Sequence, residues 1–248
     1  MMNTNDLSLE VAKRLTEIVN EAWADGSMLE AVTPTTKELL KWWFSEEQCS
    51  IRKRNFHEGQ RQAILNIIYL HEVAKVNTVT DTYEQVGSDL MAQADLATLA
   101  KAKYQIPKYA VKMATGTGKT WVMHAMLLWQ MLNARHEDEP SGRFTKNFLI
   151  VAPGLIVYDR LLDAFCGRIR RGTEYRDSQT NDFVMNQELF IPTHLRQEVF
   201  SFIQNNVVTK EEGIGKKTTG DGLIALTNWH LFESQLDEDE PQEGGAMS

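Results

Sequence analysis

A run of glycines and threonines ending in a lysine is the part of the sequence best suited to chemistry. Glycine allows the backbone angles of a tight turn and lets an anion approach main-chain N–H groups closely. A lysine directly after the last glycine can meet the β- and γ-phosphates of a nucleotide, and the hydroxyl that follows can bind Mg²⁺. The pattern predicts a phosphate-binding loop formed by Ala114, Thr115, Gly116, Thr117, Gly118, Lys119 and Thr120. We expect it to bind ATP and Mg²⁺, with Lys119 and Thr120 as catalytic residues and Thr120 as the Mg²⁺ ligand.

The loop departs from the full GxxxxGK[ST] pattern at its first position. That pattern requires glycine at position 113, where this chain has Met113. The surrounding sequence supports the prediction, because a buried strand is expected over residues 109–114 and an apolar helix over residues 120–133. A helix N-terminus adds a favourable field for anions. The alternative is a glycine-rich strand-to-helix turn that binds nothing.

The elements that would position this loop alternate between strands and helices. Buried strands are predicted at residues 148–153 and 222–227. The first is followed by a helix that runs through Leu161 and Phe165, and another helix is predicted at 194–204. This alternation predicts an α/β fold of the P-loop NTPase, RecA-like type, in which helices flank a parallel sheet. The polar stretch 167–182 is expected to form a loop.

The N-terminal third reads as helical. Amphipathic periodicity predicts helices over residues 7–23 and 57–76, and Thr35 with Glu38 forms a capping-box pattern at the start of another. Residues 77–107 are interpreted as an insertion, with a helix at 88–103. We expect three domains: a helical N-terminal extension (1–50), an incomplete first motor lobe (51–232) and an acidic disordered tail (233–248).

The bulk composition limits the class of protein. Across 248 residues the formal net charge is −8 and the sequence pI is about 5.3, which argues against a protein that coats nucleic acid by charge alone. Cys49 and Cys166 lack metal-ligand spacing, so they are predicted to be free thiols in a reducing compartment. No apolar run is long enough for a bilayer, so we expect a cytoplasmic protein with no membrane partner.

Residues 113–120 resemble motif I of superfamily 2 DEAD/DEAH-type helicases, most closely the motor (Res) subunits of type I and type III restriction enzymes. In that group the first glycine is commonly replaced. Residues 56–64 resemble the upstream glutamine motif, and Gln60 matches its glutamine. The resemblance implies that Gln60 reads the adenine of ATP, because an amide can donate and accept hydrogen bonds at once.

Two later segments follow in the order of the same family. Residues 148–154 resemble motif Ia, and residues 222–232 resemble motif Ib or Ic. The resemblance, which covers about residues 34–232, implies that Pro153, Gly154 and Thr227 contact the DNA backbone. It implies DNA as a partner, and a methyltransferase (modification) subunit as another. The basic cluster Arg168, Arg170 and Arg171 is interpreted as a solvated loop, with a DNA contact as the alternative.

A helicase motor needs an acidic DExx motif after a buried strand, and none follows Thr227. The acidic run 237–240 has the letters without the strand, so it is interpreted as a solvated run. We therefore expect the N-terminal part of a larger helicase or translocase serving restriction or another phage defence, which binds ATP without turning it over. The alternatives are another P-loop NTPase, such as a small-molecule kinase, and a non-catalytic ATP-binding interaction module.

Overall fold

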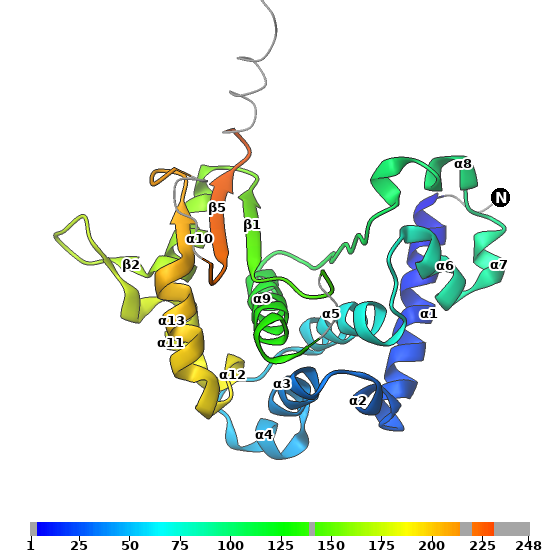
Figure 1. Cartoon of the computed structure of the whole chain (residues 1–248), viewed down its shortest axis with the longest axis horizontal. Helices are drawn as coiled ribbons and strands as arrows, with labels where there is room; N and C mark the ends of the chain where they lie inside the picture. The colour runs from blue at the N-terminus through cyan, green and yellow to red at the C-terminus, as the bar shows by residue number, and fades with distance from the viewer. Residues whose placement is uncertain (1–3, 139–141, 214–219, 231–248) are drawn as a thin grey trace, which may run out of the picture. The chain divides into compact units, whose positions relative to one another are not determined.

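The computed structural model describes residues 4–138, 142–213 and 220–230 (Figure 1). It divides into two compact units, residues 1–137 and residues 138–248. The expected domain boundaries near residues 50 and 232 stay predictions, and the expected tail lies outside the described residues. No helix in the described ranges has both the length and the apolar character needed to cross a membrane.

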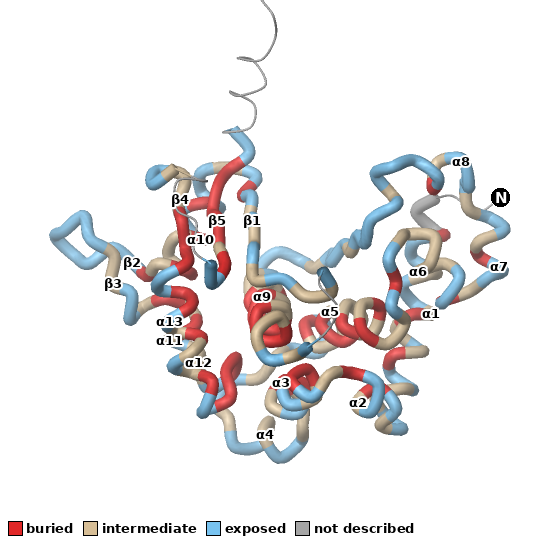
Figure 2. Tube along the Cα trace, viewed as in Figure 1, coloured by how far each residue is buried: buried red, intermediate tan, exposed pale blue. Residues whose placement is uncertain are grey.

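In the described residues of the first unit, every regular element is a helix. Its long P-loop helix α9 packs against α3 and α5, and α1 packs against α5 and α6. The packed faces carry fully buried side chains such as Trp43, Ile64 and Leu128. Figure 2 shows the buried stretches of these helices in red. The helices, in chain order, are α1 (Thr4–Ala24), α2 (Ser27–Ala31), α3 (Pro34–Phe44), α4 (Glu46–Ile51), α5 (Glu58–Ile68), the π-helix η1 (Tyr69–Val73), α6 (Val79–Val86), α7 (Ser88–Met91), α8 (Leu96–Leu99), the 3-10 helix η2 (Ala102–Tyr104) and α9 (Lys119–His136).

Three local expectations for this unit are wrong. Helix α3 is capped by Thr33 rather than Thr35, since Pro34 suits the first helical position and the Thr33 hydroxyl accepts from the Thr36 N–H. Residues 88–103 form short helices and turns instead of one helix. Residues 109–114 form no strand. A strand must pair its N–H and C=O groups with a neighbour, and the described part of this unit contains no strand that could pair with it.

The second unit holds a three-stranded parallel sheet in the order β1-β5-β4. Helix α10 contacts all three strands, and α13 contacts β5. A two-stranded antiparallel hairpin, β2 with β3, follows α10. The elements, in chain order, are β1 (Asn147–Ala152), α10 (Leu155–Cys166), β2 (Arg168–Ile169), β3 (Arg176–Asp177), the 3-10 helix η3 (Ser178–Thr180), α11 (Asp182–Met185), α12 (Gln187–Phe190), the 3-10 helix η4 (Thr193–Leu195), α13 (Arg196–Asn206), β4 (Val207–Thr209) and β5 (Leu223–Asn228).

The register of the sheet brings the carboxyl ends of β1 and β5 together. Asn147 pairs with Leu223 at one end, and Ala152 pairs with Asn228 at the other. Just past this end, the Trp229 N–H donates to the Ala152 carbonyl at 2.9 Å. Parallel strands flanked by helices confirm the expected α/β fold class.

Two expectations for the second unit need correction. β1 was expected to be buried, yet Leu149 is 57% exposed and Val151 is 39% exposed. Alternate residues of a strand share a face, so Leu149 and Val151 lie on the same face of β1, and this is the face that is exposed. The stretch expected to be a loop, 167–182, contains the hairpin and η3. Strands this short carry too little alternation to be recognised from sequence.

Candidate functional site

The glycines of the predicted phosphate loop adopt the backbone conformation that the loop requires. Gly116 has φ +82° and Gly118 has φ +73°, both in the left-handed region where a side chain is strained. Gly118 is also the N-cap of α9. A turn closes the loop, since both the N–H and the hydroxyl of Thr117 donate to the Ala114 carbonyl, at 3.4 and 2.7 Å. The loop is therefore shaped before any ligand arrives.

The main-chain donors of this loop are available to an anion. In the described ranges, the N–H groups of Gly118, Lys119 and Thr120 have no hydrogen-bond acceptor. They lie at the start of the 18-residue helix α9, where aligned peptide dipoles favour negative charge. These residues fit the phosphates of a nucleotide.

The side chain of Lys119 bonds to the backbone of the loop itself. Its Nζ donates to the carbonyls of Met113 and Ala114, at 2.9 Å each. The side chain is exposed, so it can exchange these carbonyls for an incoming anion. Thr120 is half-buried next to it, and its hydroxyl has no hydrogen-bond partner in the described chain, which leaves its oxygen available as a Mg²⁺ ligand.

Gln60 joins the loop to helix α5. Its side chain is 1% exposed. Its Oε1 accepts from the His57 N–H at 2.8 Å, and its Nε2 donates to the carbonyls of Thr117 and Gly118 at 3.1 Å each. The sequence suggested an amide presented to adenine, but here both ends of the amide are used by the protein. The role of Gln60 toward adenine therefore stays a prediction.

A buried carboxylate, which the sequence analysis missed, holds the far end of the same helices. Glu72 of η1 accepts from the Thr36 hydroxyl at 2.5 Å and the Trp129 Nε1 at 2.6 Å, and its other oxygen accepts from the Thr33 N–H at 2.9 Å. Burial raises the pKa of Glu72 above its usual value, although these hydrogen bonds oppose the rise. The available signal was a charged residue four positions after the inward-facing Ile68.

The residues predicted to contact nucleic acid lie in the second unit. Pro153 is exposed and Gly154 is half-buried, directly before α10. Thr227 is fully buried in β5 beside Val151, and its hydroxyl lies 3.5 Å from the Asn228 carbonyl. A phosphate could reach the first two in this conformation, whereas Thr227 would first have to be uncovered.

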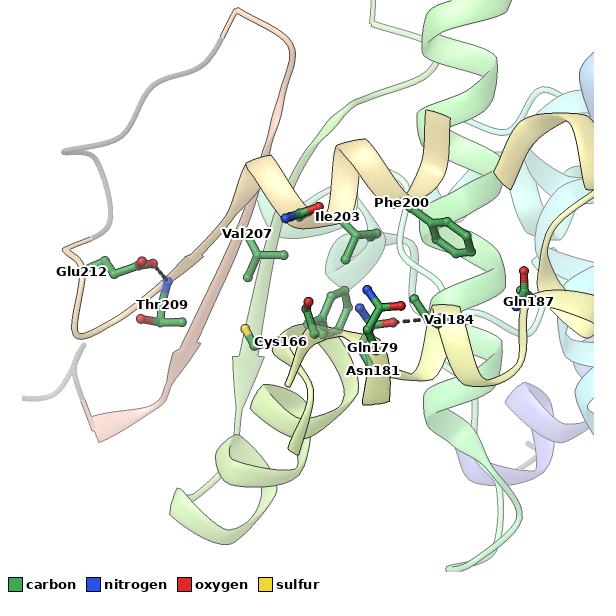
Figure 3. Close-up of a pocket in the computed structure, with 13 residues that line it drawn as sticks. Cys166, Gln179, Asn181, Val184, Gln187, Phe200, Ile203, Val207, Thr209 and Glu212 are labelled. Carbon is green, nitrogen blue, oxygen red and sulfur yellow. Dashed lines mark hydrogen bonds between the residues drawn. The ribbon is translucent and has the colours of Figure 1, made fainter. Parts of the chain in front are cut away.

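The second unit also contains a cavity of about 380 Å³ that includes none of the predicted site residues (Figure 3). Its apolar wall includes Phe165, Ile203 and Val207, and the amides of Gln179 and Asn181 face it. Cys166 also lines it, and burial raises the pKa of that thiol. The thiol is therefore held in its protonated, poorly nucleophilic form. Both cysteines are free, as predicted from the sequence.

Comparison with known families decides the identity of this arrangement. Residues 53–237, well over half of the chain, match the family described as "Type III restriction enzyme, res subunit". The chain belongs to the type III restriction enzyme Res subunit family. The match includes Gln60, the phosphate loop and the carboxyl ends of β1 and β5. No curated protein and no solved structure matches the chain.

Membership confirms the resemblance seen in the sequence. Res subunits are P-loop, helicase-like motors that depend on ATP, which agrees with the loop at the start of α9 and with the parallel sheet. The family does not by itself assign individual residues, so the roles of Gln60, Lys119, Thr120, Pro153, Gly154 and Thr227 are taken up as proposals.

Proposed function

We propose that the loop Ala114–Thr120 binds ATP with Mg²⁺, and that the chain is the ATP-binding part of a DNA translocase in a restriction or related phage-defence system. The observation that carries the proposal is the set of unpaired N–H groups at the start of α9, shaped by two left-handed glycines. Membership in the Res family supports it. Such a motor would meet foreign DNA in the cytoplasm, with a modification subunit as its partner.

The residues of the loop divide the work of holding the nucleotide. The N–H groups of Gly118, Lys119 and Thr120 would bind phosphate oxygens, and Lys119 would exchange the Met113 and Ala114 carbonyls for the outer phosphates. The Thr120 hydroxyl would hold Mg²⁺, which when bound neutralises charge on the phosphates. Gln60 would sense the nucleotide through the loop carbonyls that it already contacts.

Hydrolysis also needs a carboxylate that orients water, and no DExx motif stands between the end of β5 and the acidic run 237–240. The acidic run 237–240 lies outside the described residues. We propose that the chain by itself binds ATP without repeated turnover. For DNA, the exposure of Pro153 and the half-exposure of Gly154 support a backbone contact at the start of α10, while the burial of Thr227 does not support its part.

The test is titration of ATP·Mg²⁺ into the purified chain by calorimetry, compared with Lys119→Ala. We expect Lys119→Ala to weaken binding about ten-fold or more, because it removes a charge-assisted contact worth about 1.5–3 kcal/mol. Lys101→Ala, which removes an exposed lysine outside the loop, is the matched control and should bind like the wild type.

Equal affinity of wild type and Lys119→Ala would show that the loop does not hold the phosphates, and would favour a non-catalytic interaction module. DNA-stimulated ATPase activity with many turnovers, abolished by Lys119→Ala, would contradict the binding-only part of the proposal. Phosphoryl transfer to a small metabolite would favour a different P-loop enzyme.

A further inference from the structure

The β2–β3 hairpin, residues 168–177, extends away from the three-stranded sheet of the second unit, and its tip is exposed (Figures 1 and 2). Arg168 pairs with Asp177, and Ile169 pairs with Arg176. The next backbone bond, from the Arg170 N–H to the Tyr175 carbonyl at 2.8 Å, continues the same register. The turn at Gly172 closes it with φ +79°.

This register sorts the side chains of the hairpin onto two faces. Directly opposed residues share a face, and successive residues alternate. One face therefore carries Arg168, Arg170 and Tyr175, together with Asp177, which lies directly opposite Arg168. The opposite face carries Ile169 and Arg176. An aromatic ring and two guanidinium groups thus lie as neighbours on one side of a protruding hairpin.

Arg176 of this hairpin forms an ion pair with Asp163, whereas the other three arginines form none within the described residues. These three, Arg168, Arg170 and Arg171, are exposed. The hairpin contains four arginines and only two acidic residues, Glu174 and Asp177, although the formal net charge of the chain is −8. The Asp177 carboxylate accepts instead from the Gln179 N–H at 3.0 Å. Tyr175 is 81% exposed, although an aromatic ring is costly to leave in water.

The base of the hairpin is held firmly, unlike a solvated loop. Arg176 Nη1 donates to Asp163 Oδ1 at 2.6 Å and to the Gly167 carbonyl at 2.7 Å. A Cβ at Gly167 would lie 1.9 Å from the Asp177 carbonyl oxygen, so the two ends of the hairpin approach each other more closely than any other residue would allow. The Arg168 N–H also donates to Thr180 Oγ1 at 2.7 Å. These contacts hold the base of the hairpin to α10 and η3.

We propose that this hairpin is a binding site for single-stranded DNA, with Arg168, Arg170 and Arg171 holding phosphates and Tyr175 stacking on an unpaired base. The proposal rests on the function proposed above, a motor that acts on DNA. Charge complementarity selects a polyanion, since the rest of the chain is acidic overall. The neighbouring exposed ring selects unpaired bases over a closed duplex, because a base offers its face only when it is unstacked.

The test measures binding of a fluorescent single-stranded oligonucleotide by anisotropy over a series of salt concentrations. The wild type is compared with Arg168→Ala/Arg170→Ala/Arg171→Ala and, separately, with Tyr175→Ala. The triple variant should lower the slope of log K against log salt by about 2, because each lost phosphate contact accounts for about 0.7. Tyr175→Ala should weaken binding about five-fold or more without changing that slope.

The matched control removes the same charge from exposed lysines in the first unit, with Lys13→Ala/Lys53→Ala/Lys101→Ala. It should bind the oligonucleotide nearly like the wild type. All variants should keep the wild-type affinity for ATP·Mg²⁺, which separates this inference from the function of the loop. Circular dichroism of each variant checks the fold.

Several results would overturn the proposal. One is a triple variant that binds single strands as tightly as the control. Another is a wild-type chain that binds ATP but no oligonucleotide. Binding of a blunt duplex as tight as that of a single strand, unaffected by Tyr175→Ala, would refute the stacking role. If Lys119→Ala leaves ATP binding unchanged while the hairpin variants lose DNA, the proposed nucleotide site fails and the hairpin stands.

Discussion

Gly118 is constrained twice. Its φ of +73° lies in the left-handed region, and a Cβ there would lie 2.3 Å from Gln60 Nε2. Gly116 shares only the first constraint, since its φ is +82° but nothing lies within 4 Å of an added Cβ. The two glycines look alike in the sequence, yet only one of them allows Gln60 to reach the loop.

This difference gives a prediction. Gly118→Ala should weaken ATP·Mg²⁺ binding more than Gly116→Ala, because it adds a steric clash to a backbone strain of about 1–2 kcal/mol. Calorimetry on both variants measures the difference. Gln60→Ala combined with Gly118→Ala should recover part of the loss by removing the clashing amide. Equal losses for the two single alanine variants, with no recovery in the double variant, would show that the Gln60 contact does not shape the loop.

At this scale the sequence alone was enough to predict the loop that we propose binds the nucleotide. The order Gly116, Gly118, Lys119, Thr120 follows directly from the chemistry of phosphate binding, so no distant contact was needed to predict the loop. The partners of Gln60 could not be predicted, because the loop carbonyls that it contacts lie more than fifty residues away. Glu72 was missed for the same reason, since its three donors come from α9, from α3 and from the residue capping α3.

Among the elements, Glu72 joins three through hydrogen bonds to its carboxylate. Its carboxylate accepts hydrogen bonds from Thr36 of α3 and Trp129 of α9. Glu72 itself lies on η1, which continues α5. Asn133, one turn further along α9, adds a bond from its Nδ2 to Thr36 Oγ1 at 2.9 Å. The helix that carries Gln60 and the helix that begins at the phosphate loop are therefore fixed to each other at both ends.

We predict an effect of pH on stability that Glu72→Gln removes. Burial raises the folded pKa of Glu72 above the ordinary value of 4.5, so the folded state binds this proton more tightly than the unfolded state. Its contribution is fully present below pH 4.5 and is lost as pH rises through the folded pKa. Urea unfolding from pH 4 to pH 8 measures this contribution as the difference in the free energy of unfolding between the wild type and Glu72→Gln.

The control for this prediction is Glu84→Gln, at an exposed glutamate. Its stability should follow the wild type at every pH. The prediction would be contradicted if the free energy of unfolding of Glu72→Gln changed with pH in parallel with that of the wild type. Glu72→Ala should lower the free energy of unfolding by on the order of 3 kcal/mol, because buried donors lose their acceptor.

The elements themselves were predictable where their patterns were local. Helix α1 and strands β1 and β5 are found within a few residues of their expected positions, because amphipathic periodicity and apolar runs belong to the segment itself. The strand expected over residues 109–114 is absent, because an apolar run becomes a strand only beside a neighbour. The hairpin was missed because its pairing covers two residues on each side.

For the molecule as a whole, the nucleotide site and the sheet belong to different compact units. Gln60, Glu72 and the loop all lie in the first, and the aromatic core around Phe183 lies in the second. Phe183 packs on Phe165 and Phe190, with ring centroids 5.4 and 6.1 Å apart. Each unit thus has its own buried side chains.

We therefore predict that Phe183→Ala destabilises the second unit by about 3–5 kcal/mol while leaving ATP·Mg²⁺ affinity unchanged at low temperature. Trp43→Ala, at a fully buried tryptophan of the first unit, should instead reduce that affinity. Calorimetric binding, alongside thermal unfolding of each variant, makes the comparison. Loss of ATP binding in Phe183→Ala would show that the two cores fold as one.

The bonds that Lys119 and Gln60 make within the loop have a consequence for the timing of nucleotide capture. Lys119 must first leave the two carbonyls, each 2.9 Å from its Nζ, before it can bind an arriving phosphate. The carbonyls of the loop therefore compete with the phosphate for the lysine. At the proposed ATP site, capture would then have two stages, encounter followed by exchange of partners, and its observed rate would level off at high ATP instead of rising without limit. Dissociation of the nucleotide would reverse these stages, because the two carbonyls lie close enough to bond to the lysine again.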